Sequence, residues 1–185
     1  LFNTMRYFAG DVTWVNGHVT AGGREIGLGD ALEASEPIGL IAGDSITGYY
    51  NFANGAVGSF ISRANQPGKG RGFGLHMIGD HGSVAMRGKG RGIFIDRRDH
   101  WAPSEGSTGW DLMDLETAEL HRDGNRLVIE DLIVAIEKGS EPLSSARTAR
   151  EALEMIHGVY AAQLSGARVQ LPLAVRSHPL AQLQI

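Results

Sequence analysis

The sequence contains no cysteine among its 185 residues. This absence excludes a disulfide framework, thiolate metal sites and cysteine nucleophiles, and it is compatible with a reducing cytoplasm. The sequence also lacks any apolar run close to the roughly 20 residues needed to cross a bilayer, and it lacks a signal-peptide pattern. With 42% hydrophobic and 21% charged residues, it is typical of a globular protein with room for one domain. We therefore expect a cytoplasmic protein with no membrane partner.

The net charge of −4 conceals a basic segment. Between Arg63 and Arg98, eight basic residues are accompanied by only Asp80 and Asp96, so this segment carries +6 and the remainder −10. The segment indicates either an anionic ligand or solvated hairpin edges that resist strand-to-strand aggregation, and we favour the second interpretation. Nucleic-acid binding would depend steeply on salt, and the acidic remainder argues against it. We expect no nucleic-acid partner.

The first ten residues are predicted to be helical, but they contain no helix start signal. Gly10 is well placed to end a helix, but no initiator Met and no capping residue precedes Leu1. The apolar stripe of this predicted helix consists of Leu1, Phe2, Met5, Phe8 and Ala9. A chain that began inside such a stripe would fray, so we expect the sequence to be part of a longer protein.

Alternating patterns predict antiparallel strands in the first hundred residues. The stretch "DVTWVNGHVT" at 11–20 is typical of a strand. Asn54–Gly55 is the preferred pair for a two-residue hairpin turn, which would pair Phe52 with Val57. A second hairpin is predicted around "GDHG", followed by a strand in "GIFID" at 92–96. Residues 97–124 show no clear periodicity.

The last third is predicted to be helical. Ser145 can cap the start of the second helix and Gly166 can end it. The apolar stripes are Val128, Ile129, Leu132, Ile133 and Ile136 in the first helix, and Ala149, Leu153, Ile156, Tyr160 and Leu164 in the second. A short strand with Pro172 follows, which favours a sheet edge. This order predicts an α+β fold, with an open, mainly antiparallel β-sheet and helices packed on one face.

No complete active site follows from chemistry alone. The sequence "GKGRG" occurs at 68–72 and 88–92, but both copies lead into strands, whereas a phosphate-binding loop leads into a helix N-terminus. There is no Ser–His–Asp order, no H-E-x-x-H and no carboxylate pair. We expect no metal site. Among the histidines, His157 is expected to be a partly buried packing residue, and His100 beside Trp101 is a better site candidate.

Several motifs in order resemble one enzyme family. The run "IEDLIVAIEKGSEPLSSARTAREALEMIHGVYAAQLSGARVQLPL" closely resembles the end of the Gfo/Idh/MocA oxidoreductases. The family pattern is a helix ending in A-I-x-x-G, a Pro, a helix with A-L-E-x-I, and a V-x-L-P strand. Upstream, "YYNFANGAVGSF" resembles the family's N-G hairpin and "MIGDHGSVAM" its I-G-x-x-G strand pair. The stretch "LFNTMRYFAGDVTWV" resembles the helix and strand that begin the family's second domain.

The resemblance implies that residues 1–185 form a single substrate-binding and oligomerisation domain of an NAD(P)-dependent oxidoreductase. Its substrate would be a sugar, cyclitol or related hydroxylated small molecule. In the family, a dinucleotide-binding domain with a Gly-rich turn and an E-K-P lysine comes first, and this sequence has neither motif. We therefore expect NAD or NADP in the parent protein, and neither tight cofactor binding nor turnover by this chain alone. The implied partners are the missing domain and, through the sheet, a second copy of the chain.

The family's D-x-x-x-H-x-x-D helix implies the positions of site residues. It places the acid–base His immediately before Leu1 and its final Asp on Asn3, so no catalytic residue is expected in the chain. Asn3 cannot ionise and so cannot act as a base, although it can orient the substrate or the helix, and a solvent-facing role is equally open. The candidate substrate-binding residues are Asn3, Arg63, Asn65, Gln66, Arg71 and His100.

Two other functions stay open. One is an NAD-dependent glycosidase of the same superfamily, which would never release its cofactor and would show no net change in cofactor redox state. The other is a stand-alone dimerisation or binding module without catalysis, which would have a start codon directly before Leu1.

Overall fold

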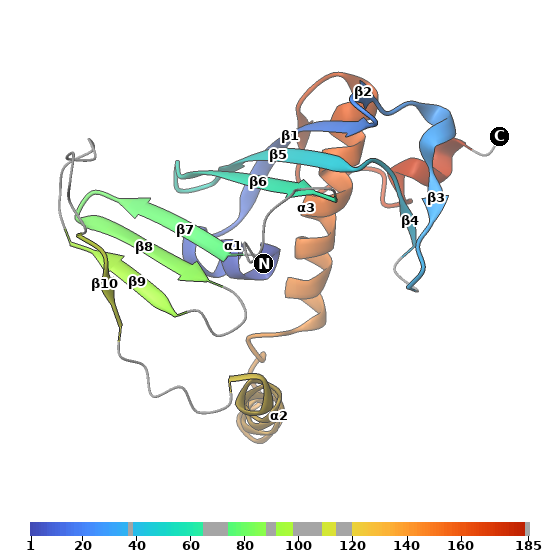
Figure 1. Cartoon of the computed structure of the whole chain (residues 1–185). Coiled ribbons are helices and arrows are strands. Elements are labelled where there is room, and N and C mark those ends of the chain that lie inside the picture. Colours follow the sequence, from blue (N-terminus) through green and yellow to red (C-terminus); the bar gives the residue numbers. More distant parts are fainter. Residues whose placement is uncertain (37–38, 65–73, 88–91, 98–108, 114–119, 184–185) are drawn as a thin grey trace. The chain divides into compact units, whose positions relative to one another are not determined.

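The structure, a computed structural model, describes residues 1–36, 39–64, 74–87, 92–97, 109–113 and 120–183 (Figure 1). These residues belong to two compact units, one of residues 2–67 and 144–185 and the other of Leu1 with residues 68–143, and each is described by itself. The predicted site residues Asn65, Gln66, Arg71 and His100 lie outside the described residues.

The first unit is a five-stranded antiparallel sheet with two helices on one face (Figure 1). The strand order is β11-β1-β5-β6, and β2 pairs with β1. A separate two-stranded sheet, β3 with β4, and two 3₁₀-helices complete the unit. The helices are α1 (Phe2–Ala9), α3 (Ala146–Ser165), η1 (Leu28–Asp30) and η2 (Pro179–Leu183), and the strands are β1 (Val12–Ala21), β2 (Arg24–Glu25), β3 (Leu32–Glu33), β4 (Leu40–Ile41), β5 (Ser45–Phe52), β6 (Val57–Arg63) and β11 (Val169–Gln170). The predicted α+β class is confirmed, and the last strand lies at a sheet edge as Pro172 indicated.

The hairpin between β5 and β6 forms where predicted, but its register differs by one residue. Val57 pairs with Asn51, whereas a two-residue loop would have paired it with Phe52. The amide of Phe52 donates to the carbonyl of Ala56, and Gly55 has φ +88°, so the loop has three residues and ends in a left-handed glycine. The longer loop pairs Phe60 with Gly48, and so turns Phe60 to the same face of the sheet as the buried Tyr50.

Helix α3 packs against the sheet at a notch made of glycines. Gly17 on β1 and Gly48 on β5 are cross-strand partners, and Val159 of α3 packs onto both. A Cβ atom on Gly48 would lie 2.8 Å from Cγ2 of Val159, and one on Gly17 would collide with the Val159 carbonyl oxygen. On the helix side, a Cβ atom on Gly158 would lie 2.5 Å from Cγ1 of Val15. The three glycines thus allow a helix–sheet approach that any side chain would prevent.

The buried face of α3 differs from the predicted stripe. Tyr160 is buried as expected, but Leu153 and Ile156 are 46% and 36% exposed. The buried positions are Glu154, Met155, Gly158, Val159, Tyr160 and Ala162. The contact face is centred on Gly158 and Val159, which allow close approach to the sheet, so the predicted stripe was wrong at Ala149, Leu153 and Ile156. The Ser145 cap is confirmed, since its hydroxyl accepts from the amide of Thr148.

The second unit contains a four-stranded antiparallel sheet in the order β10-β9-β8-β7, and the helix α2. Its elements are β7 (Gly74–Gly79), β8 (Gly82–Arg87), β9 (Ile93–Asp96), β10 (Asp111–Leu112) and α2 (Leu120–Lys138). The predicted hairpin is confirmed with Met77 opposite Val84, as is the strand predicted at 92–96. Helix α2 forms where a helix was predicted, but the side chains of its predicted apolar stripe remain 47–71% exposed.

Two histidines meet where η2 packs against α3. The rings of His157 and His178 have centroids 4.4 Å apart, and Nδ1 of His178 accepts from the amide of Leu180, which is fully buried. Burial is the main cause that lowers the pKa of His157. The charge of His178 lowers this pKa further, and the charge of Glu154 acts in the opposite direction. Burial also lowers the pKa of His178, although a hydrogen bond with the backbone of Leu40 raises it in part. Both rings therefore favour the neutral form in the folded state.

We predict that Gly17→Ala destabilises the protein by about 1–3 kcal/mol, because the new methyl group overpacks against Val159. The measurement is urea-induced unfolding. Gly29→Ala is the matched control, because a Cβ atom there has no neighbour within 4 Å, and it should change the free energy of unfolding by less than about 0.5 kcal/mol. Equal stability of the two variants would contradict the close contact.

We predict that the protein loses stability as the pH falls below the ordinary histidine pKa of 6.5. Both pKa values are lowered on folding, so below that pH the unfolded chain binds more protons than the folded one. The double variant His157→Gln/His178→Asn should flatten this dependence, since Asn can accept from Leu180 but cannot titrate. The measurement is the unfolding midpoint between about pH 7 and pH 5. His81→Asn, at an exposed turn, should retain the wild-type slope, and an unchanged slope in the double variant would refute the prediction.

Candidate functional site

Helix α1 carries the predicted site residue Asn3 in its first turn. The helix ends at Gly10, whose φ is +81° and whose amide donates to the carbonyl of Arg6 at 2.7 Å. Met5 is buried, and the ring of Phe2 lies 4.7 Å from the ring centroid of Phe60 on β6. These apolar contacts hold the first turn of α1 against the sheet.

Asn3 is half-buried, and its side chain makes no hydrogen bond with any other described residue. An amide has two donor hydrogens and an acceptor oxygen. The geometry therefore leaves the full hydrogen-bonding capacity of Asn3 available to a ligand or to solvent.

Arg63 is exposed at the end of β6, and its Nη1 donates to the hydroxyl of Ser45 at 3.0 Å. Side chains alternate between the faces of a strand, and Phe60 faces α1, so Arg63 belongs to the opposite face. The structure therefore does not bring Asn3 and Arg63 together on one face of the sheet.

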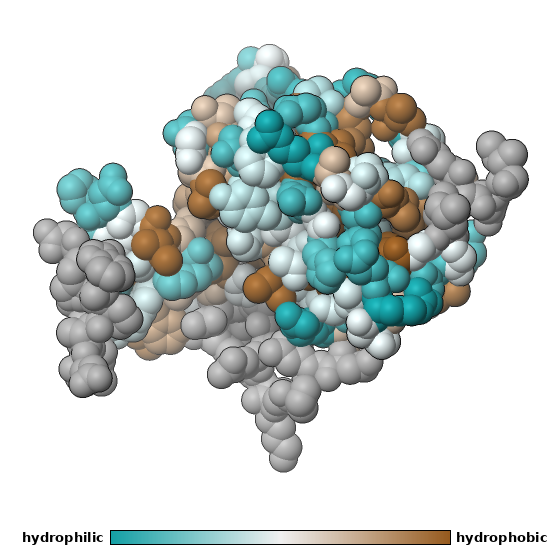
Figure 2. Space-filling model, turned by 90° about the horizontal axis from the view of Figure 1, so that it is seen from above, coloured by the Kyte–Doolittle hydropathy of each residue, from teal (hydrophilic) through white to brown (hydrophobic). Residues whose placement is uncertain are grey.

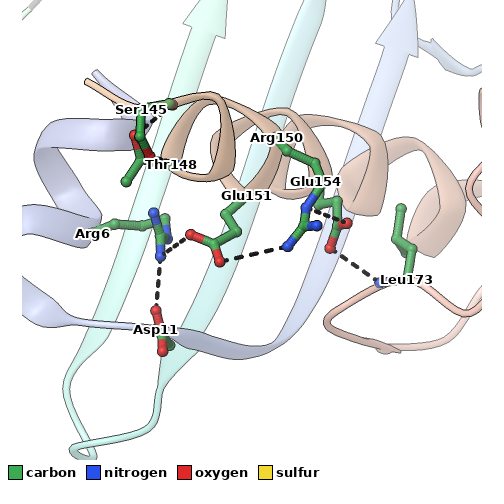
Figure 3. Close-up of polar contacts among 8 residues, drawn as sticks. All are labelled: Arg6, Asp11, Ser145, Thr148, Arg150, Glu151, Glu154 and Leu173. Carbon is green, nitrogen blue, oxygen red and sulfur yellow. Dashed lines mark hydrogen bonds and ion pairs between the residues drawn. The ribbon is translucent and has the colours of Figure 1, made fainter. Parts of the chain in front are cut away.

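A chain of alternating charges joins α1, the start of β1 and α3 (Figure 3). Arg6 Nη2 contacts Asp11 Oδ1 at 2.8 Å and Glu151 Oε2 at 2.5 Å. Arg150 continues the chain, with Nη2 at 3.7 Å from Glu151 and Nε at 3.7 Å from Glu154. The Arg6 side chain is only 11% exposed, whereas Asp11 is 81% exposed. The largely buried side chain of Arg6 thus lies at the centre of this network.

Glu154 is the buried end of the chain of charges. Its Oε2 accepts from the amide of Leu173 at 3.4 Å, which ties α3 to the segment after β11 (Figure 3). Its Oε1 is buried and accepts no hydrogen bond from the described residues. Glu154 therefore stabilises a backbone amide across the unit while retaining an acceptor that has only the nearby Arg150 charge.

The network lines a pocket of about 280 Å³ in this unit. Val12, Met155 and Leu171 contribute apolar parts of its wall. Its charged residues can bind polar groups, but the described residues that line it include no Ser, Cys or His nucleophile. On the face shown in Figure 2, hydrophilic and hydrophobic residues are interspersed, so surface hydropathy there does not mark one binding area.

The described residues offer neither a metal-binding cluster nor a membrane-spanning helix. They contain no group of three or more His, Asp or Glu residues able to hold a metal ion. None of the described helices is long and apolar enough to cross a membrane.

Sequence reasoning missed the charge network. A partial signal was present, because Arg150 and Glu154 have the i,i+4 spacing of a helical ion pair. The contact between Arg6 and Glu151 joins residues 145 positions apart, and no local pattern predicts it. The predicted packing role of His157 is confirmed by its contact with His178.

The comparison with known families gives one match over nearly the whole chain. The model of the Gfo/Idh/MocA "Oxidoreductase family, C-terminal alpha/beta domain" matches residues 2–171. The chain belongs to this family. No curated protein matches it.

Solved structures of oxidoreductases share the fold. Levoglucosan dehydrogenase in complex with NADH and L-sorbose has a TM-score of 0.68 and 16% identity, covering 92% of this chain and 48% of that one. An oxidoreductase from Agrobacterium radiobacter, in complex with NAD+, L-tartaric acid and magnesium, has a TM-score of 0.60 and 15% identity, covering 91% and 46%. The WlbA dehydrogenase from Bordetella pertussis, in complex with NADH and UDP-GlcNAcA, has a TM-score of 0.53 and 16% identity, covering 93% and 45%. The chain thus spans just under half the length of these structures.

The described residues do not fit a dinucleotide site. Every strand pair among them is antiparallel, so they contain no parallel strand–helix–strand unit to present a Gly-rich turn to a pyrophosphate. We assign no cofactor contact to them.

We predict that Glu154→Ala lowers the free energy of unfolding by about 1–3 kcal/mol, because the buried amide of Leu173 loses its acceptor. Urea-induced unfolding measures the change. Glu25→Ala removes a carboxylate that is 69% exposed and should leave stability within about 0.5 kcal/mol of the wild type. An equal effect of the two substitutions would mean that the Leu173 contact contributes nothing.

Proposed function

We propose that the chain is the substrate-binding and oligomerisation domain of an NAD(P)-dependent oxidoreductase that acts on a sugar, cyclitol or related hydroxylated small molecule. The observation that carries the proposal is the family match over residues 2–171. Solved structures with the same fold hold NADH together with L-sorbose, levoglucosan or UDP-GlcNAcA, which supports this substrate class. A dinucleotide-binding domain outside this chain would supply the nicotinamide chemistry.

In this proposal, Asn3 is a substrate contact. It occupies the family's final Asp position, it lies in the first turn of α1, and its amide is unpaired within the described residues. A neutral amide donates to and accepts from hydroxyl groups, so it suits an uncharged polyol better than proton transfer. The family's acid–base His would lie immediately before Leu1. Contributions from Arg63 and from the segment that follows it stay predictions.

We further propose that the open face of the five-stranded sheet joins a second copy of the chain. The side chains of Tyr49, Val57 and Ile61 belong to this face and are 40%, 60% and 63% exposed. Trp14 lies on the same face beside Tyr49, and the guanidinium of Arg168 lies 5.2 Å from its ring centroid. A face that combines aromatic residues with arginine is typical of protein interfaces.

The experiment is an assay of the complete open reading frame that contains this chain. Purified protein would be supplied with NAD+ or NADP+ and a panel of sugars, cyclitols and polyols, and formation of reduced nicotinamide would be followed by absorbance. We expect turnover by the longer protein, and neither turnover nor tight cofactor binding in calorimetry by the 185-residue chain.

Three outcomes would contradict the proposal. Glycoside cleavage without net cofactor reduction would identify the glycosidase alternative. A start codon directly before Leu1 would favour a binding module without catalysis. Tight NAD(P) binding by this chain alone would show that the cofactor site had been assigned to the wrong domain.

A further inference from the structure

We propose that Glu151 is a positioning residue of the reaction, which acts through Arg6 to hold α1 in the orientation that the substrate site requires. The inference rests on the proposed function, because the site it serves is the first turn of α1. It concerns a residue of α3, far along the chain from that turn, that touches neither substrate nor cofactor in the proposal.

Helix α1 cannot hold its own position. It has eight residues, or about 12 Å of helix, and isolated helices of this length are marginal in water. Its first turn has no acidic residue to stabilise it. The position and orientation of α1 therefore depend on contacts with other elements.

Those contacts hold α1 at both ends. At the first turn, the Phe2 ring lies 4.7 Å from the Phe60 centroid and 6.0 Å from that of Tyr50. In the last turn, the guanidinium of Arg6 contacts carboxylates of Asp11 and Glu151. Aromatic contacts limit translation but allow a helix to tilt, whereas an ion pair made by the largely buried Arg6 side chain at the far end restricts the tilt.

The two carboxylates are not equivalent. Asp11 follows directly after α1 and is 81% exposed, so its attraction for Arg6 is local and screened by water. Glu151 is 28% exposed and belongs to α3, which is fixed on the sheet by the notch at Gly17 and Gly48. The contact between Arg6 and Glu151 thus joins a short helix to the most constrained helix of the unit.

Loss of the Glu151 charge should move the first turn of α1. With a neutral partner at position 151, Arg6 is drawn towards Asp11 and solvent, and α1 can tilt about its aromatic end. A displacement of about 1 Å in reacting groups can lower a rate about a hundredfold. The substitution should therefore reduce kcat more than it reduces the affinity for either ligand.

The test uses Glu151→Gln with two readouts. The first is hydrogen exchange of the α1 amides up to Gly10, which should become about tenfold faster, while the amides of β5 stay unchanged. The second is steady-state kinetics of the complete protein, in which kcat should fall about tenfold to a hundredfold with the KM for the dinucleotide unchanged. Rates are normalised to the folded fraction, so a purely structural loss of stability would not alter kcat.

Two further variants complete the test. Glu151→Asp keeps the charge and should recover much of the lost kcat. Glu130→Gln is the matched control, because Glu130 makes a comparable 2.6 Å contact with Arg126 on α2, and it should leave both readouts unchanged.

The outcomes separate this inference from the proposed function. Wild-type kcat and wild-type α1 exchange in Glu151→Gln would overturn the positioning role, as would equal loss of kcat in Glu130→Gln. If the wild-type protein catalyses no hydride transfer, the proposed function fails. The exchange measurement then decides by itself whether Glu151 holds α1.

Discussion

The close approach of α3 to β1 and β5 is the constraint on which the rest of the first unit depends. It requires Gly17 and Gly48 to be cross-strand partners, because only paired glycines leave room for Val159 between neighbouring strands. It also sets which face of α3 is buried, and so brings Glu154 to the amide of Leu173 and Glu151 to Arg6. Apolar packing of α3 thus sets the positions of Glu151 and Glu154, and the contact of Glu151 with Arg6 then orients the short helix α1.

The contacts that stabilise the fold are therefore different from the contacts that the proposed reaction needs. In the apolar core, Val15, Tyr50 and Met155 are fully buried and carry no formal charge. The network from Asp11 to Glu154 adds direction, because a guanidinium donates hydrogen bonds only in the plane of its fork. In the proposed enzyme, the sheet and α3 are the rigid support and α1 presents the substrate contact, so residues that fix α1 matter more for the reaction than for folding.

Much of the fold could be predicted from the sequence, because its signals are local. Gly10, Ser145 and Gly166 mark helix ends through backbone conformation and capping, and each acts at its own position. The register of the β5–β6 hairpin could not be predicted, because Asn54–Gly55 suits both a two-residue and a three-residue loop. The buried face of α3 depends on glycines more than a hundred residues away, and so does the arrangement of the charge network. Of the candidate site residues, Asn3 and Arg63 lie on different faces of the sheet. The alternation of side chains along β6 predicts the face of Arg63 only when the register of β6 and the position of α1 are known.

In the proposed enzyme, the first turn of α1 lines the substrate site. The most direct measurement is a crystal structure of the complete protein with its nicotinamide cofactor and a bound polyol or sugar. We predict a ligand hydroxyl within hydrogen-bond distance of the Asn3 side chain. A ligand bound at the nicotinamide but remote from α1 would contradict it.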